Sequence, residues 1–269
     1  QVNMKVAALL KEYKLGESAK LLYEFTWNDF CDWYVEFAKQ RFNNKETNNR
    51  QISEKVLIKV LNDILVMIHP FMPHITEELW HVLQLKSDKE LLSLQKWPTQ
   101  ENKFVDNKLD NSFQQLFEII RLIRNLRAEL GLKPSEKVPV YLISDNDELI
   151  DFLKILVDDI QTLTKSSEVF IFKPNAVDKK EFAKSFSGII SDLEVYLPFQ
   201  DFVNIDALKE RLNKDLKKVT IELDNLNKRL SNKNFVDKAP KDIVDECRFK
   251  LNEGSVQMGR ITKKLELLN

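Results

Sequence analysis

The sequence predicts a mainly α protein with three parts: a helical bundle over residues 1–130, a small α+β connector over 131–203 and an antiparallel coiled-coil hairpin over 204–269. Three observations predict this fold class. Only 5 glycines and 8 prolines punctuate 269 residues, so tight turns are few. Apolar residues recur every three or four positions through the first half of the chain, which is the period of an amphipathic helix. After residue 204 that spacing becomes a sustained heptad repeat.

Four helices are expected in the bundle. The first runs over residues 17–42, and the polar stretch NNKETNN (43–49) ends it. The second runs over 50–68, where prolines interrupt the pattern because proline lacks the N–H that a helix requires. The third begins at Pro73, a favoured first position of a helix, and the fourth covers 108–130.

The connector is expected where the apolar period changes. VPVYLI (138–143), EVFIF (168–172) and LEVYLPF (193–199) are rich in β-branched and aromatic residues, as strands are. The stretch 147–163 between the first two is helical in pattern. We therefore expect a two- or three-stranded sheet against one or two helices.

Two heptad segments predict the hairpin. Their core positions are Leu212, Leu216, Val219, Leu223, Leu226 and Leu230, then Val244, Cys247, Leu251, Gly254, Met258, Ile261, Leu265 and Leu268. Gly254 is the one weak core position, and Pro240 is expected to start the second helix after the break at 231–242. The two segments should fold back on each other over about 35–40 Å, at 1.5 Å per residue.

Composition restricts the classes of function. The net charge is −1, so any nucleic acid must be bound by local basic patches rather than by a global field. Cys31 and Cys247 are too far apart in sequence to suggest a disulfide framework or a zinc cluster, and free thiols fit a reducing, cytoplasmic location. No apolar run reaches transmembrane length, so no membrane partner is expected. The chain opens without Met inside a helical pattern, which suggests a fragment of a longer protein.

The stretch HPFMPHITEELWH (69–81) holds all three histidines. On a helix, Ile75, Leu79 and Val82 share the predicted buried face, while the polar side chains lie on an opposite, solvated face. His74 and His81 are two turns apart, about 10 Å along the axis, which is too far for one metal ion. We expect no metal site here. No glycine-rich phosphate loop or nucleophile–base arrangement occurs in the sequence, so no catalytic residue is expected either.

Basic residues gather in three places. Residues 39–59 hold six Lys or Arg against two acids, and 206–241 hold ten against six. Arg121, Arg124 and Arg127 form a ladder at a spacing of three. Such patches either contact phosphates or are solvated faces with intrahelical ion pairs, and charge alone leaves both readings open.

Several motifs resemble one group of enzymes. YEFTWNDFCDWYVEFAK (23–39), HPFMPHITEELW (69–80) and WP (97–98) resemble the anticodon-binding helical bundle of the class I synthetases for valine, isoleucine and leucine. IIRLIRNLRAELGLKPSEKV (119–138) resembles the last bundle helix of the same group. LNKRLSNKNFVDKAPKDIVDECRFKL (226–251) is similar to the C-terminal coiled-coil arm of the valyl-tRNA synthetase family in particular.

The resemblance implies that 1–130 is an anticodon-binding bundle and 204–269 a tRNA-binding arm, so the partner would be tRNA(Val). The catalytic and editing domains, with ATP and Mg²⁺ as cofactors, would lie outside this monomeric chain, which itself needs none. The alternative is a structural helical module that docks another protein. The implied tRNA-binding residues are Arg41, Arg50, Lys55, Lys59, Phe71 and His74 on the anticodon side, Lys214, Lys217, Lys228, Arg229, Lys233 and Lys238 on the arm, and Arg121, Arg124 and Arg127 as phosphate contacts. His74 stands where this family commonly has Phe, a ring that can stack on an unpaired base.

Overall fold

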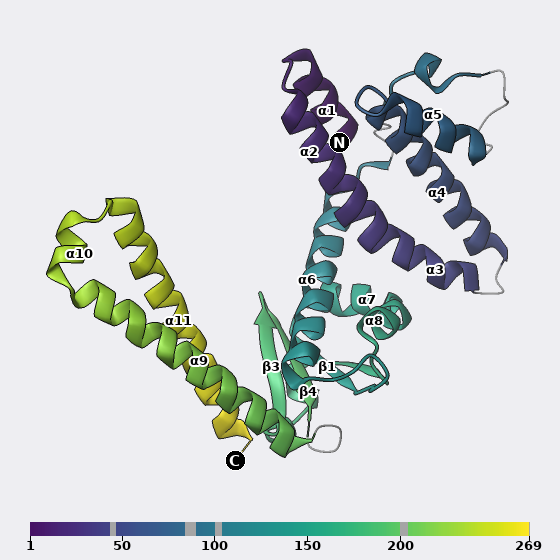
Figure 1. The fold of residues 1–269 in the computed structure, drawn as a ribbon. Coiled ribbons are helices and arrows are strands. Elements are labelled where there is room, and N and C mark those ends of the chain that lie inside the picture. The colour runs from purple at the N-terminus through teal and green to yellow at the C-terminus, as the bar shows by residue number, and fades with distance from the viewer. Residues whose placement is uncertain (44–46, 84–89, 100–103, 200–203, 269) are drawn as a thin grey trace. The chain divides into compact units, whose positions relative to one another are not determined.

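The computed structural model describes residues 1–43, 47–83, 90–99, 104–199 and 204–268, which form two compact units. The units are residues 1–107 and 108–269, and the structure is mostly helical, as predicted (Figure 1). The division into 1–130, 131–203 and 204–269 stays a prediction. Helix α6, which the sequence grouped with the bundle, belongs to the second unit.

Helices make up the first unit. In chain order they are α1 (Val2–Lys11), α2 (Leu15–Glu24), η1 (Phe25–Val35), α3 (Glu36–Asn43), α4 (Thr47–Ile68), α5 (Pro73–Val82) and the short η2 (Leu92–Leu94). The predicted helix over 17–42 is thus continuous from α2 to α3, but its middle, η1, is a wider π-helical stretch. Tyr34 in this stretch donates a hydrogen bond from its hydroxyl to the carbonyl of Ser53, 3.1 Å away, which fixes η1 on α4.

Two small apolar clusters hold this unit together. Val6, Leu22 and Met67 form one of them, and these three side chains are no more than 3% exposed. Leu65, Val66, Trp80 and Leu92 form the other. Both clusters include side chains from the C-terminal end of α4, so this helix organises the unit.

The prediction of which face of α5 is buried is wrong. Ile75, Leu79 and Val82 are 46%, 41% and 65% exposed, whereas Thr76 and Trp80 are buried. The reason lies in the size and polarity of Trp80. Its indole fills the space beside α4 and η2, and its N–H finds an acceptor there in the Asn62 side chain, at 2.8 Å.

The second unit contains a sheet of four strands rather than the two or three predicted. These are β1 (Val140–Ser144), β2 (Val169–Phe172), β3 (Ser185–Ile190) and β4 (Leu193–Pro198), in the order β2-β1-β4-β3. β1 and β2 are parallel, while β4 is antiparallel to both β1 and β3. The missed strand is β3, whose sequence SFSGII has two serines and a glycine in place of strand-forming residues.

Helices line the sheet and connect its strands. They are α6 (Asn107–Leu130), α7 (Asp147–Ile155) and α8 (Val157–Thr164), with the short η4 (Pro174–Ala176) and η5 (Lys179–Phe182) before β3. Close packing explains why β3 contains a glycine. A Cβ at Gly188 would lie 2.7 Å from a methyl carbon of Leu122 on α6. α6 therefore packs directly against the sheet, which is why it belongs to the second unit.

The hairpin consists of α9 (Ile205–Ser231), α10 (Lys233–Lys238) and α11 (Lys241–Leu267) (Figure 1). The predicted break thus contains a short helix, and Pro240 is the N-cap rather than the first residue of α11. Gly254 is not a weak position, because a Cβ there would lie 2.8 Å from a methyl carbon of Leu223. The glycine lets the two helices approach closely at this level.

The base of the hairpin is fixed to the end of α6. Arg211 donates a hydrogen bond to the carbonyl of Glu129, and the Lys264 ammonium lies 2.6 Å from the Glu129 carboxylate. α6 ends at Leu130, and the next residue, Gly131, has a φ of +73°, which suits a residue without a side chain. Both helices of the hairpin are therefore tied to one turn of α6.

Candidate nucleic-acid interface

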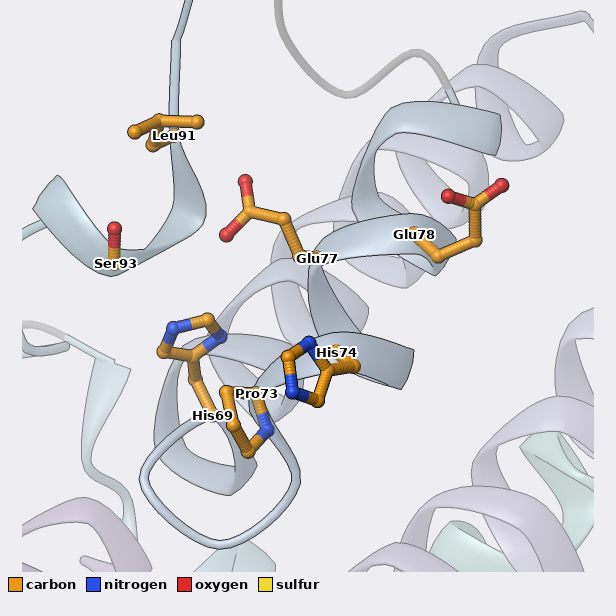
Figure 2. Close-up of a pocket in the computed structure, with 7 residues that line it drawn as sticks. All are labelled: His69, Pro73, His74, Glu77, Glu78, Leu91 and Ser93. Atoms are coloured by element: carbon orange, nitrogen blue, oxygen red, sulfur yellow. The ribbon is translucent and has the colours of Figure 1, made fainter.

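An open pocket of about 490 Å³ lies at the corner between α4 and α5. It is lined by His69, Pro73, His74, Glu77, Glu78, Leu91 and Ser93 (Figure 2). Pro73 sets the geometry of the corner, since it occupies the first turn of α5 and cannot continue α4. The pocket therefore lies between the start of α5 and the chain at η2.

His69 is held in place by one hydrogen bond. Its Nδ1 lies 2.9 Å from Oγ1 of Thr76, a residue that is 2% exposed. The Thr76 oxygen also lies 2.8 Å from the carbonyl oxygen of Met72 and 3.2 Å from that of Pro73. Thr76 thus joins the His69 ring to the first turn of α5.

Glu77 joins α5 to the η2 segment. Its Oε1 accepts the backbone N–H of Leu92 at 2.8 Å and lies 3.2 Å from Nε2 of His81. Burial alone would raise the pKa of the Glu77 carboxyl, but the N–H groups of Leu92 and Ser93, with His69 and His81 nearby, outweigh it and lower this pKa. The side chains of Glu77 and His81 are only about a quarter exposed, so the prediction that they lie on a solvated face is wrong.

Phe71 and Arg41 make contacts inside the first unit. Phe71 is half-buried and packs against the cluster that contains Val6 and Met67. Arg41 donates to the carbonyl of Phe37 at 2.8 Å and lies over the ring of the same residue. Both side chains thus have a structural role, and their predicted contact with tRNA stays a prediction.

The basic residues of α4 divide into paired and unpaired. Arg50 lies 2.9 Å from Glu54, and Lys59 lies 2.5 Å from Asp63, both at a spacing of four along the helix. Lys55 is exposed, and no acid among the described residues pairs with it. The solvated-face reading therefore describes Arg50 and Lys59, whereas Lys55 keeps its charge available.

The arginine ladder of α6 does not form one surface. Arg127 is only 6% exposed, and its guanidinium donates to the carbonyls of Lys133 and Glu136, at 3.2 and 2.8 Å. Burial lowers the pKa of Arg127, although Glu136 opposes this effect. Its position leaves no surface for a phosphate. Arg124 donates to the carbonyl of Leu163 at 3.0 Å, and Arg121 is exposed.

The hairpin presents exposed cations. Lys214 is paired with Glu210 at 2.9 Å, whereas Lys217 and Lys228 are exposed and have no acidic partner among the described residues. Near the tip, the Arg229 guanidinium lies over the Phe235 ring at 5.2 Å. The side chains of Lys233 and Lys238 lie outside the part of the chain that the structure describes.

Sequence reasoning missed the hydrogen bond between Thr76 and His69, which lines the pocket. The two residues are seven positions apart and on different sides of a proline corner, so no helical spacing connects them. Across the residues that the structure describes, no group of three or more His, Cys, Asp or Glu side chains is arranged to hold a metal ion. Within the same residues, no helix has the length and apolar character needed to span a membrane.

Two known protein families match separate parts of the chain. The family described as the anticodon-binding domain of tRNA ligase matches residues 1–142, more than half of the chain. The chain belongs to this family. A second family, described as the valyl tRNA synthetase tRNA binding arm, matches residues 204–269, which fold as the α9–α11 hairpin.

Relatives over nearly the whole chain are named valine–tRNA ligases. The protein from Prochlorococcus marinus subsp. pastoris is 72% identical over 268 residues, which cover 100% of this chain and 29% of that protein. The proteins from Synechocystis sp. and Carboxydothermus hydrogenoformans are both 38% identical, over 100% and 92% of this chain and 30% and 27% of their own lengths. The chain thus spans less than a third of these relatives and matches their C-terminal part.

Proposed function

We propose that this chain is the tRNA-binding C-terminal region of a valine–tRNA ligase. In this proposal the first unit docks the anticodon stem-loop of tRNA(Val), and the α9–α11 hairpin contacts the tRNA core or elbow. The observation that carries the proposal is the coincidence between fold and family at the hairpin. The residues that match the tRNA binding arm form a helical hairpin, on which Lys217 and Lys228 are exposed and have no acidic partner among the described residues.

The remaining functions belong to other parts of such an enzyme. ATP-dependent aminoacylation, with Mg²⁺, takes place in the catalytic domain, and editing in a further domain, neither of which this chain contains. These domains are its partners in the same polypeptide. The chain works as a monomer in the cytoplasm, and it needs no cofactor of its own because its role is to bind and orient tRNA.

A filter-binding titration with tRNA(Val) at two salt concentrations tests this proposal. Phosphate contacts release counterions, so we expect the dissociation constant to rise with salt, with a slope of about 0.7–0.9 in the logarithms per contact. Binding that does not depend on salt, or no binding at low salt, would contradict the proposal. The latter result would favour a structural module that docks another protein.

The role of His74 has its own test. His74 is exposed at the rim of the pocket, where its ring faces outward beside Pro73 (Figure 2). If the residue stacks on a base, His74→Phe should preserve or strengthen binding of an anticodon stem-loop, because a phenyl ring stacks at least as well. A clear loss of affinity would show that the imidazole acts through a hydrogen bond instead.

A further inference from the structure

One turn at the end of α6 receives a positive charge from each helix of the hairpin. Arg211 of α9 donates a hydrogen bond to the backbone carbonyl of Glu129, and the ammonium of Lys264 on α11 lies 2.6 Å from the Glu129 carboxylate. The last carbonyls of a helix lack partners within it and carry partial negative charge, so cations are stabilised at this end. The C-terminus of α6 therefore attracts both hairpin helices at the same place.

Each of these cations has a second contact in the same unit. A Cβ at Gly131 would lie 2.6 Å from a guanidinium nitrogen of Arg211, so this guanidinium packs directly over the backbone at Gly131. Phe186 of β3 is 2% exposed, and its ring centre lies 5.7 Å from the Lys264 ammonium. A cation is attracted to the face of an aromatic ring. Arg211 thus joins α9 to α6, and Lys264 joins α11 to both α6 and β3.

Contacts from both helices restrict the hairpin more than one contact could. A pair of helices attached at a single point can still rotate about that point, whereas attachments from α9 and α11 together oppose the rotation. The two helices also pack closely on each other, since a Cβ at Gly254 would lie 2.8 Å from a methyl carbon of Leu223. The hairpin therefore cannot change its pose as a whole without breaking the contacts of Arg211 or Lys264.

We propose that Glu129, Arg211 and Lys264, which we call the base contact, hold the hairpin in one pose before tRNA binds and are positioning residues for tRNA binding. In this role none of the three has to touch the RNA. A surface that is already ordered loses less conformational freedom when it binds, so a fixed pose raises affinity. The effect on affinity rests on the proposed function, because it requires that the hairpin bind tRNA.

The distance between two spin labels measures the pose without any RNA. The labels are attached at Asn225→Cys on α9 and Lys154→Cys on α7, both exposed positions of the 269-residue chain. The native thiols are removed by Cys31→Ser and Cys247→Ala. Pulsed electron paramagnetic resonance then gives the distribution of distances, and we expect one narrow peak in this parent chain.

Reversal of one charge should open the base contact. Glu129→Lys places a third cation beside Arg211 and Lys264, so we expect the single narrow peak to be lost. The exchange variant Glu129→Lys, Lys264→Glu restores a pair of opposite charges, so the narrow peak should return. Glu118→Lys is the control, because Glu118 is an exposed acid on the same helix, and it should keep the narrow peak. Circular dichroism should show the helical content of the parent in every variant.

Filter binding with tRNA(Val) measures the consequence for affinity. Glu129→Lys and Glu118→Lys make the same change in charge, which by itself favours RNA binding. If the base contact positions the hairpin, Glu129→Lys should bind about threefold to tenfold more weakly than Glu118→Lys, the cost of ordering one or two side chains anew. The exchange variant has the net charge of the parent and should recover most of the parent's affinity.

The outcomes distinguish this inference from the proposed function. A single narrow peak in Glu129→Lys overturns the inference and leaves tRNA binding intact. A broad distribution in the exchange variant also overturns it, because the pairing of charges is then not what fixes the pose. Equal affinities of Glu129→Lys and Glu118→Lys overturn the positioning role. No binding of tRNA by the parent at low salt overturns the proposed function, while the distances still decide whether the base contact fixes the pose.

Discussion

The α4–α5 corner and the α9–α11 hairpin differ in shape and in the charge of their exposed side chains. The corner is hollowed, and His69, His74, Glu77 and Glu78 are among the described residues that line it. The hairpin is two helices thick and exposes cations along its length, among them Lys217 and Lys228. The two regions therefore present different chemistry: imidazole and carboxylate groups around a hollow at the corner, and exposed ammonium groups along the hairpin.

The two regions also depend on different packing. The corner keeps its shape because Trp80, which is 0% exposed, joins α5 to α4 and η2. The hairpin depends on a long row of small contacts such as the one between Leu223 and Gly254. The stability of the corner therefore depends mainly on one large side chain, whereas the stability of the hairpin is spread over many contacts between its two helices.

Truncation of Trp80 should have the largest effect. Trp80→Ala removes a buried ring and the hydrogen bond to Asn62, so we expect a loss of about 3–5 kcal/mol in the free energy of unfolding of the first unit. Leu79→Ala, one position away and 41% exposed, should cost less than about 1 kcal/mol. Urea denaturation followed by circular dichroism measures both. Equal effects would show that α5 buries the face expected from its apolar pattern.

A substitution at Gly254 tests the hairpin in the same way. Gly254→Leu restores the apolar heptad position but places a side chain against Leu223, so we expect a loss of about 1–3 kcal/mol from overpacking. Gly259, on the same helix, has no atom within 4 Å of a Cβ added there. Gly259→Ala should therefore stabilise α11 by about 0.5–1 kcal/mol through helix propensity. If thermal unfolding shows that Gly254→Leu is also stabilising, the close approach of the two helices is not required.

The hairpin and α5 show what the sequence could predict about the fold and what it could not. The heptads placed the hairpin correctly because each helix has one neighbour, the other helix, and its buried face repeats over many turns. α5 has only ten residues and several neighbours, so one Trp with a polar tip decided its orientation against the apolar pattern. β3 was missed because its serines and glycine are poor strand formers, and Gly188 is there for the close packing against Leu122 of α6.

The candidate site divides in the same manner. Helical geometry correctly predicted that His74 lies on an exposed part of α5, whereas its role in binding stays a prediction. It did not show that Arg127 is buried, since its partners are backbone carbonyls that come into reach only when the chain turns after α6. The pocket itself requires Leu91 and Ser93, which the sequence separates from His69 by more than twenty residues.

Charge reversal on the hairpin should weaken tRNA binding in a salt-dependent way. The double variant Lys217→Glu, Lys228→Glu removes two unpaired cations, so we expect about tenfold weaker binding at low salt and a salt slope smaller by about 1 for each cation that touches a phosphate. Lys214→Glu is the control, because Glu210 already neutralises this cation and its removal should matter less. Filter binding at several salt concentrations measures these differences. A salt slope unchanged in the double variant would assign the phosphate contacts to another surface, such as the one around Lys55.

The smallest expected effect concerns Glu77 and separates the corner from the hairpin by pH. The pKa of Glu77 is lowered in the folded chain, so its ionised form stabilises the corner above the ordinary pKa of 4.5, and this contribution is lost as the pH falls below that value. Glu77→Gln lacks this ionisation and keeps only a neutral acceptor for the N–H of Leu92, so we expect it to be less stable than the parent by about 1 kcal/mol at pH 7. The difference should shrink below pH 4.5, where the parent carboxyl is also neutral.

Glu210→Gln is the matched control on the hairpin. Its pKa is lowered too, by Lys214, but the pair is exposed to solvent, so the variant should change stability little at either pH. A difference between Glu77→Gln and the parent that stays constant from pH 7 to pH 3 would mean that the size of the amide, not the missing charge, disturbs the contact between α5 and η2.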